Sequence, residues 1–513
     1  MKKILISTIA VSALLFTVSC ETDFDTDVSN IQVTNGQANF TKFVSVGNSL
    51  TSGYRDGALY IDGQNESFPS MMAQQMQLAG GGAFTQPMMP NNVGGFTSLF
   101  AASGMKDFYG KLTLKVVNGA LSPTPSAPAA DIDIIGGPGK MFNNMGVPGA
   151  KSFHLGAPGY GNPAGLAIGA ANPYFVRFAT GPNASVIGDA MAQAPTFFSL
   201  WIGNNDVLSY ATSGGSGIDQ TGTGNNPTTY GANDITDPDV VTQVINSYVT
   251  ALTSGGAKGV IANIPNVTSI PFFTRVPYNP LTPALLGSNI TALNTSLYGP
   301  LKQALTAFGA GSRLNLLSAT SANPLLIVDN DLPNLSAQLT AALTPSLGAP
   351  TAAAFGQIYG RARQATSKDL VLLTASSAIG ATVTGAPASI NVNGISYPMA
   401  NQYVLTEKET AKVLTATAAY NASIQAIATA KGLAFVDANA KMAELSKSSG
   451  IQFDGVKYTA TFVTGGTFSL DGVHLTGRGY ALIANEFLRV INQKYKSTLP
   501  MVNVNSYQGV TFP

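Results

Sequence analysis

The positions of apolar residues along the chain predict alternating buried strands and helices. Short apolar and β-branched runs, most of them ended by glycine or proline, predict buried strands. These runs cover residues 43–46, 197–202, 258–264 and 433–437. Helical spacing or alanine-rich composition predicts helices over residues 240–252, 413–430 and 480–495. The alternation predicts an α/β fold with a parallel central sheet and helices on both faces, in which ligands bind beyond the carboxyl ends of the strands.

Three long segments interrupt this alternation and are interpreted as insertions. Residues 56–140 are rich in Gly, Met and Pro, and residues 211–236 form a loop of Gly, Thr and Asn that we expect to be mobile and solvated. Residues 266–408 hold Leu/Ala stretches, such as 334–347 and 352–366, between prolines. We expect this last block to be a largely helical insertion and a candidate cap over the site.

The N-terminus has the pattern of a secretory signal. A basic start precedes an apolar run over residues 4–18 that is shorter than the roughly 20 residues a membrane-spanning helix needs. The residues before Cys20 resemble a bacterial lipobox, although Thr17 replaces the usual leucine. This resemblance implies a signal peptide over 1–19, lipidation of Cys20 and a tether over 20–40; ordinary secretion with a free Cys20 is the alternative.

The tether and the composition bear on location and partners. The acidic residues after Cys20 resemble the export tags of surface lipoproteins in the Bacteroidetes, so we expect an outer-membrane lipoprotein facing the cell surface or the periplasm. The 513 residues carry 27 Lys and Arg against 26 Asp and Glu, a net charge of +1, and this balance argues against nucleic-acid binding. One cysteine and two histidines without helical metal-ligand spacing predict no metal and no cofactor.

Two segments carry candidate residues for acyl transfer. Ser49 follows a predicted strand and Gly47, a context that exposes a hydroxyl at the carboxyl end of the strand beside backbone N–H groups. Asp471 and His474 precede the last predicted helix, where the carboxylate is placed to orient the imidazole as a proton acceptor. Taken singly, Ser49 also fits a helix N-cap, and Asp471 fits a capping residue beside a surface histidine.

Two further segments offer hydrogen-bond donors. Asn205 follows the predicted strand over 197–202, and its amide is suited to stabilise a developing oxyanion. Gly149 ends an Asn-x-Gly-x-x-Gly segment, where the absence of a Cβ lets a backbone N–H approach a ligand closely. An Asn-rich turn and a plain loop are the alternative interpretations of these segments.

The four segments together, in this order, resemble the SGNH (GDSL) hydrolase family. The resemblance covers the core, about half of the chain, and leaves the insertions uncovered. It implies a three-layer α/β/α hydrolase domain over 41–495, with a C-terminal tail over 496–513. The core of that domain comprises residues 41–55, 141–210, 237–265 and 409–495.

The resemblance also assigns roles to residues. It implies that Ser49 is the nucleophile, His474 the general base and then acid, and Asp471 the residue that orients His474. Gly149, Asn205 and the N–H of Ser49 then form the oxyanion hole. One departure is Asn48, which stands where the family has Asp and puts the electrostatics of this loop in doubt.

The expected function is therefore that of a membrane-anchored serine esterase or lipase. Its expected partners are an ester substrate, either a lipid or an acylated glycan, the membrane, and an outer-membrane protein. The alternatives are a carbohydrate O-acetylesterase and a catalytically silent surface lipoprotein that acts as a binding or assembly module. His154, five residues past Gly149, is either a pocket-lining residue or a partly exposed loop histidine.

Overall fold

The protein is mixed α/β, with a parallel five-stranded sheet at its centre. The computed structural model describes residues 32–103, 108–117 and 119–513; Cys20 and the signal segment lie outside these residues. Neighbouring strands in the sheet follow the order β11-β6-β5-β1-β4. Their bounds are β1 Phe43–Gly47, β4 Asn144–Gly146, β5 Phe197–Trp201, β6 Lys258–Ala262 and β11 Ala434–Val436. Every pairing in this sheet is parallel, which confirms the predicted fold class at this level.

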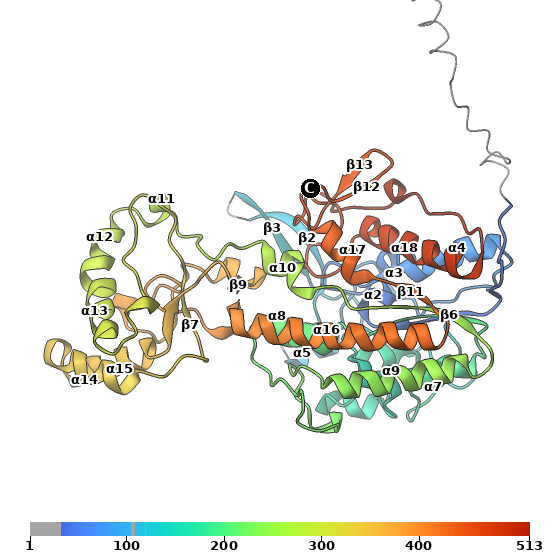
Figure 1. Cartoon of the computed structure of the whole chain (residues 1–513), viewed down its shortest axis with the longest axis horizontal. Helices are drawn as coiled ribbons and strands as arrows, with labels where there is room; N and C mark the ends of the chain where they lie inside the picture. The colour runs from blue at the N-terminus through green and yellow to red at the C-terminus, as the bar shows by residue number, and fades with distance from the viewer. Residues whose placement is uncertain (1–31, 104–107, 118) are drawn as a thin grey trace, which may run out of the picture.

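Helices lie on both faces of the sheet (Figure 1). On one face α4 (Phe68–Leu78) packs against α18 (Gly477–Tyr495), where the rings of Phe68 and Phe487 stack at 4.7 Å. On the other face α9 (Pro238–Thr253) packs against α16 (Glu407–Ala430), and the hydroxyls of Thr242 and Ser423 bond at 2.8 Å. The predicted helices over 240–252, 413–430 and 480–495 are therefore confirmed.

Residues 56–140 contribute more to the core than their irregular composition suggests. They contain α3 (Ile61–Asn65), α4, α5 (Thr97–Ser103) and the hairpin of β2 (Gly110–Val117) and β3 (Ala120–Ser126). In α4 the buried residues Phe68, Met71, Met72 and Met76 have helical spacing, and the Ser67 side chain caps the first turn.

The insertion over residues 266–408 forms a second lobe with its own apolar core (Figure 1). Its helices include α13 (Gly299–Ala307), α14 (Ser336–Leu347) and α15 (Ala349–Tyr359). The prediction of a largely helical insertion is too strong, because two small antiparallel ladders lie between the helices. These are β7–β8 (Leu326–Val328 with Ala362–Gln364) and β9–β10 (Leu370–Val371 with Val404–Leu405).

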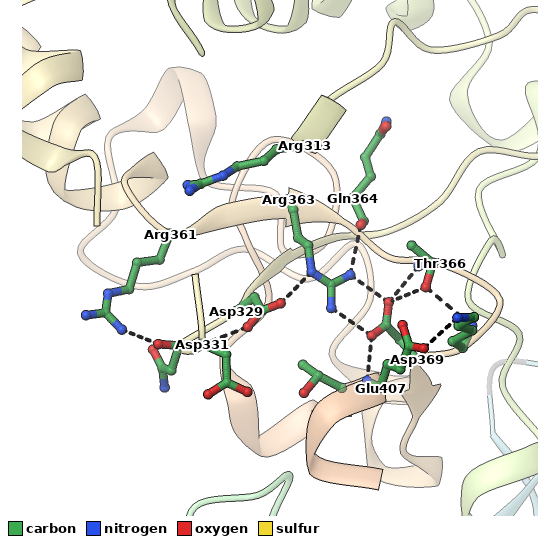
Figure 2. Close-up of polar contacts among 12 residues, drawn as sticks. Arg313, Asp329, Asp331, Arg361, Arg363, Gln364, Thr366, Asp369 and Glu407 are labelled. Atoms are coloured by element: carbon green, nitrogen blue, oxygen red, sulfur yellow. Dashed lines mark hydrogen bonds and ion pairs between the residues drawn. The ribbon is translucent and has the colours of Figure 1, made fainter. Parts of the chain in front are cut away.

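Within the block expected to be largely helical, the stretch over 352–366 is helical only as far as Tyr359, and Ala362–Gln364 forms strand β8. Arg363 on this strand bonds Asp329 and Asp369, each at 2.6 Å, in the polar cluster that Figure 2 shows. Asp369 in turn accepts the backbone N–H of Glu407, the first residue of α16. These ion pairs hold the extended strand in place and fasten the second lobe to the long helix of the core.

The remaining segments are mostly irregular. Residues 211–236 contain one short helix, η5 (Pro227–Thr229), and are anchored where the Lys151 ammonium donates to the carbonyl of Asp234 at 2.7 Å. The tail after α18 packs against the core through the buried residues Val502 and Val504. Among the described residues, no helix combines the length and the apolar character that crossing a bilayer requires.

Candidate active site

Ser49 lies directly beyond the carboxyl end of β1, as the sequence predicts. It is the first residue of the short helix α2 (Ser49–Ser52), whose N-cap Asn48 accepts the N–H of Leu50 at 3.1 Å. A Cβ on Gly47 would lie 2.1 Å from the Thr51 hydroxyl and 2.4 Å from the Trp201 carbonyl. Glycine is therefore required at this turn, which brings α2 close to the neighbouring strand β5.

Asp471 and His474 lie in the loop that leads into α18. An isolated antiparallel bridge between Phe468 and Leu475 closes this loop, and the Ser469 N–H donates to the His474 carbonyl at 2.8 Å. Thr476 then caps α18 by accepting the N–H of Gly479. The loop geometry is thus fixed on both sides of the imidazole.

The three side chains form a continuous hydrogen-bonded chain. His474 Nε2 lies 2.9 Å from the Ser49 hydroxyl, and His474 Nδ1 lies 2.9 Å from Asp471 Oδ2. Ser49 is 7% exposed, and the His474 and Asp471 side chains are 15% and 13% exposed. The order carboxylate, imidazole, hydroxyl is the arrangement in which a histidine accepts the proton of an attacking serine.

The environment of Asp471 keeps its carboxylate ionised. Burial raises its pKa, but the adjacent His474 and hydrogen bonds from backbone N–H groups outweigh burial and hold the pKa well below its usual range. Oδ1 accepts the N–H groups of Val473 and His474, both at 2.8 Å, and Oδ2 accepts the N–H of Gly57 at 2.9 Å. A permanently charged acceptor at Nδ1 favours the tautomer that leaves Nε2 free to take the serine proton.

Some supporting residues carry no motif in the sequence. The Ser469 hydroxyl donates to Asp471 Oδ1 at 3.0 Å and accepts the N–H of Asp56 at 2.9 Å, while Asp56 Oδ1 accepts the N–H of Leu470 at 3.0 Å. Asp56 has a left-handed backbone with φ 54° and precedes Gly57 with φ 74°. An Asp-Gly pair in the sequence predicts a turn. Only the fold shows that this turn is hydrogen-bonded to the loop that carries Asp471 and His474.

Three donors follow three adjacent strands of the sheet. Ser49 follows β1, Gly149 follows β4 and Asn205 begins α8 (Asn205–Thr212) after β5. In the described part of the chain, the N–H groups of Ser49 and Gly149 donate to no protein acceptor. Gly149 is exposed and has φ 80°, and a Cβ added there would have only Asn172 Nδ2 within 4 Å, at 3.9 Å. Both N–H groups are therefore available to a ligand.

The amide of Asn205 is held in place by a backbone bond. Its Nδ2 donates to the Ala150 carbonyl at 2.9 Å, which ties the start of α8 to the loop after β4 and uses one of the two amide hydrogens. The second hydrogen is not needed for this bond. Among the described residues it donates to no acceptor, so Asn205, 7% exposed, keeps one donor available to a ligand.

Asn48 makes a contact that an aspartate at this position does not. Its Nδ2 donates to Asn204 Oδ1 at 3.2 Å, while its own Oδ1 caps α2. A carboxylate offers only acceptors. The amide therefore links the nucleophile turn to the segment before Asn205 without adding a second negative charge beside Ser49.

An open cleft of about 790 Å³ leads to the triad and includes Asp471 and His474 in its lining. The hairpin β2–β3 forms one wall, and the insertion forms another through residues 272–277 and η9 (Leu373–Ser377). The insertion attaches directly to the triad loop, since the Phe272 N–H donates to the Gly472 carbonyl at 2.9 Å. Its first residues thus border the site, as a capping role requires.

A second cavity of about 110 Å³ adjoins the site. Leu50, Trp201 and Val473 contribute to its predominantly apolar lining, and none of the three triad residues does. Of these two cavities, only the larger cleft is lined by members of the hydrogen-bonded chain, namely Asp471 and His474. Among the residues that the structure describes, no group of three or more His, Cys, Asp or Glu side chains is placed to hold a metal ion.

His154 is outside the lining of the cleft. Its ring stacks on Tyr160 with centroids 4.8 Å apart, and its Nδ1 accepts the N–H of Lys151 at 3.1 Å. Burial, together with the positive charge of Lys151, lowers its pKa to about 4. The residue does not line the cleft. It is half-buried, which agrees with the expected partial exposure, but it lies in the short helix η3 (Ser152–Gly156) and not in an irregular loop.

His154 makes folding sensitive to acid. Its neutral form is favoured in the folded protein, whereas an unfolded histidine titrates near pH 6.5. The unfolded state therefore binds the proton first, and the free energy of unfolding falls as the pH drops from about 6.5 toward 4, by up to about 3 kcal/mol from this residue. Denaturant unfolding of wild type and His154→Gln at several pH values measures this pH dependence. We expect the unfolding free energy of the variant to fall less steeply with decreasing pH than that of wild type. An equally steep fall in both proteins would contradict a lowered pKa of His154.

Asn205→Ala is expected to lower kcat toward a chromogenic ester by roughly 10²–10³-fold with little change in KM, because the donated bond strengthens only as the oxyanion develops. The variant also loses the bond to Ala150, so we expect a stability loss of about 1 kcal/mol. Steady-state kinetics and thermal unfolding separate the two effects. A variant that melts earlier but turns over at the wild-type rate would remove Asn205 from the oxyanion hole.

Comparisons with known proteins leave the site to be interpreted from its own geometry. The chain matches no protein-family model, and a search of curated proteins finds no match either.

Proposed function

We propose that the protein is a serine ester hydrolase of the SGNH type. The observation that carries this proposal is the Ser49–His474–Asp471 chain, in which both contacts are 2.9 Å long and Ser49 lies 425 positions before His474 in the sequence. A binding module does not require a hydroxyl, an imidazole and an ionised carboxylate in this order. The unused N–H groups of Ser49 and Gly149 and the amide of Asn205 complete what acyl transfer needs.

In the proposed reaction, His474 Nε2 takes the proton of Ser49 as its oxygen attacks the ester carbonyl. The oxyanion accepts bonds from the N–H groups of Ser49 and Gly149 and from the Asn205 amide. The intermediate collapses to an acyl-serine, and the imidazolium returns the proton to the departing alcohol. Water, deprotonated by His474, then attacks the acyl group, and Ser49 recovers its proton as the acid leaves.

We further propose that the enzyme is a lipoprotein held to the outer membrane through Cys20, as the lipobox-like sequence indicates. The volume of the cleft, about 790 Å³, suits an ester with a large acyl or alcohol part, such as a lipid or an acylated glycan, because pockets of about 300–1,000 Å³ accommodate ligands well above the size of acetate.

A series of 4-nitrophenyl esters from acetyl to long-chain tests this proposal. We expect saturable hydrolysis by the full chain, and we expect a fluorophosphonate to abolish this hydrolysis. A strong preference for acetyl would favour the O-acetylesterase reading of the same site. Hydrolysis no faster than with heat-denatured protein would contradict an esterase function.

A further inference from the structure

Among the residues that the structure describes, Arg275 in the cleft has no side-chain partner, in contrast to every other arginine. The remaining seven all bond an acidic or amide side chain, a tyrosine hydroxyl or a backbone carbonyl of the described residues; they are Arg55, Arg177, Arg313, Arg361, Arg363, Arg478 and Arg489. Figure 2 shows this for Arg361 and Arg363. Arg275 is exposed and makes no side-chain hydrogen bond or ion pair within the described part of the chain.

Arg275 lines the same cleft as His474 and Asp471. It follows the short helix α10 (Pro271–Thr274) one turn after Phe272, whose N–H bonds the triad loop at Gly472. The loop contact is tight, since a Cβ on Gly472 would lie 3.1 Å from the Phe272 nitrogen. The backbone that carries Arg275 is therefore held in a fixed place relative to the triad.

The charge of Arg275 is not balanced within the cleft. The other titratable lining residues are Tyr54, Asp471 and His474. The Tyr54 hydroxyl donates to the Gly57 carbonyl, and Asp471 and His474 are bonded to each other. Around Arg275 the lining is largely apolar, with Phe272, Val276, Pro277 and Leu373 among its members. A planar guanidinium can bind a carboxylate or phosphate through two parallel hydrogen bonds, and the neighbouring apolar side chains offer a surface for a hydrocarbon part of the same ligand.

We propose that Arg275 is a specificity-determining residue and that the cleft takes esters that carry an anionic group, a carboxylate or a phosphate, beside a hydrocarbon part. The inference rests on the proposed ester hydrolysis and names its substrate class. The anionic group binds Arg275 while the ester carbonyl lies at Ser49, so the charge acts on binding and orientation and takes no part in bond making.

Matched ester pairs test this assignment. In one pair the anion is in the acid part (mono-4-nitrophenyl glutarate against 4-nitrophenyl valerate), and in the other it is in the alcohol part (3-acetoxybenzoate against phenyl acetate). The variants are Arg275→Gln, Arg275→Lys and, as the control, Lys431→Gln, which removes an exposed cation at the end of α16, outside the cleft. The pair in which wild type prefers the anionic ester identifies which part of the substrate bears the charge.

For that pair we expect Arg275→Gln to lower kcat/KM for the anionic ester by about 10- to 100-fold, the range for a hydrogen bond to a charged group, and to leave the neutral ester within about twofold. Arg275→Lys should recover part of the loss, because the charge remains and the paired geometry does not. The Lys431→Gln variant should behave as wild type. Equal losses on both esters, or no loss on either, would overturn the proposal.

Binding separates this inference from the proposed function. Calorimetric titration of the unhydrolysed anionic ester into Ser49→Ala protein, with and without Arg275→Gln, requires no turnover. Binding weakened about tenfold or more by Arg275→Gln supports the anion site even in a protein that hydrolyses no ester, and unchanged binding refutes the site even in an active esterase.

Discussion

Ser49→Ala is expected to reduce kcat toward a chromogenic ester by roughly 10⁴–10⁶-fold, the range found when the nucleophile of a catalytic triad is removed. The hydroxyl is the only group of the triad that can form the acyl intermediate, and alanine leaves the imidazole without a proton to accept. The fold should be retained, because the Asn48 cap of α2 and the buried strand β1 do not depend on the hydroxyl. Steady-state kinetics and circular dichroism check both statements.

Ser52→Ala is the matched control for this variant. Ser52 lies in the same helix and is buried, but its hydroxyl donates to the backbone carbonyl of Ser49 and bonds no side chain of the triad. We expect Ser52→Ala to keep most of the activity at a stability cost of about 1 kcal/mol. If Ser49→Ala were to retain activity comparable to that of Ser52→Ala, Ser49 would not be the nucleophile.

His474→Ala is expected to cost nearly as much as Ser49→Ala, because the two residues act as one unit through the 2.9 Å contact between Nε2 and the hydroxyl. The double variant should then be little worse than either single variant. Such non-additivity is the kinetic signature of a nucleophile and its base. Measuring kcat for both single variants and the double variant gives the coupling directly.

His154→Gln serves as the control for the loss of a histidine, since His154 stacks on Tyr160 and is outside the lining of the cleft. It should retain wild-type kcat near neutral pH. Losses from Ser49→Ala and His474→Ala that multiply in the double variant would indicate that the two residues act independently, contrary to the geometry.

The core was predictable where local patterns are strong. The runs over 43–46 and 197–202 are buried on both faces of the sheet, so their apolar content marks them as strands without further information. Strand β4 has no such signal, because it is three residues long and starts with Asn144. The amide of Asn144 is satisfied by the Thr51 carbonyl and Gln86, partners that only the fold supplies.

Tertiary contacts also explain where the expectation of a largely helical insertion fails. The run over 352–366 begins with three alanines but contains Gly356 and Gly360, and the helix ends at Tyr359 with Gly360 as its C-cap before strand β8 follows. The ion pairs of Arg363 with Asp329 and Asp369 stabilise the extended backbone there, and neither aspartate lies within helical reach in sequence. Propensity is a weak prior, and such contacts override it.

The site was predictable to the extent that its residues lie in short motifs. Ser49, Asp471, His474, Gly149 and Asn205 each stand beside a glycine turn, a strand end or a helix start that is recognisable in sequence. The contact of Gly57 with Asp471 and the placement of Arg275 in the cleft have no local signature. They arise because the chain brings together segments hundreds of residues apart.

Covalent labelling reports directly on whether Ser49 is an activated nucleophile. Full-length protein is treated with a fluorophosphonate probe, and the modified residue is located by mass spectrometry of its peptides. We predict one adduct per chain on Ser49, no adduct in Ser49→Ala, and greatly slowed labelling in His474→Ala. Wild-type protein that stays unlabelled, or that is modified at a different serine while Ser49 stays free, would contradict the assignment of Ser49 as an activated nucleophile.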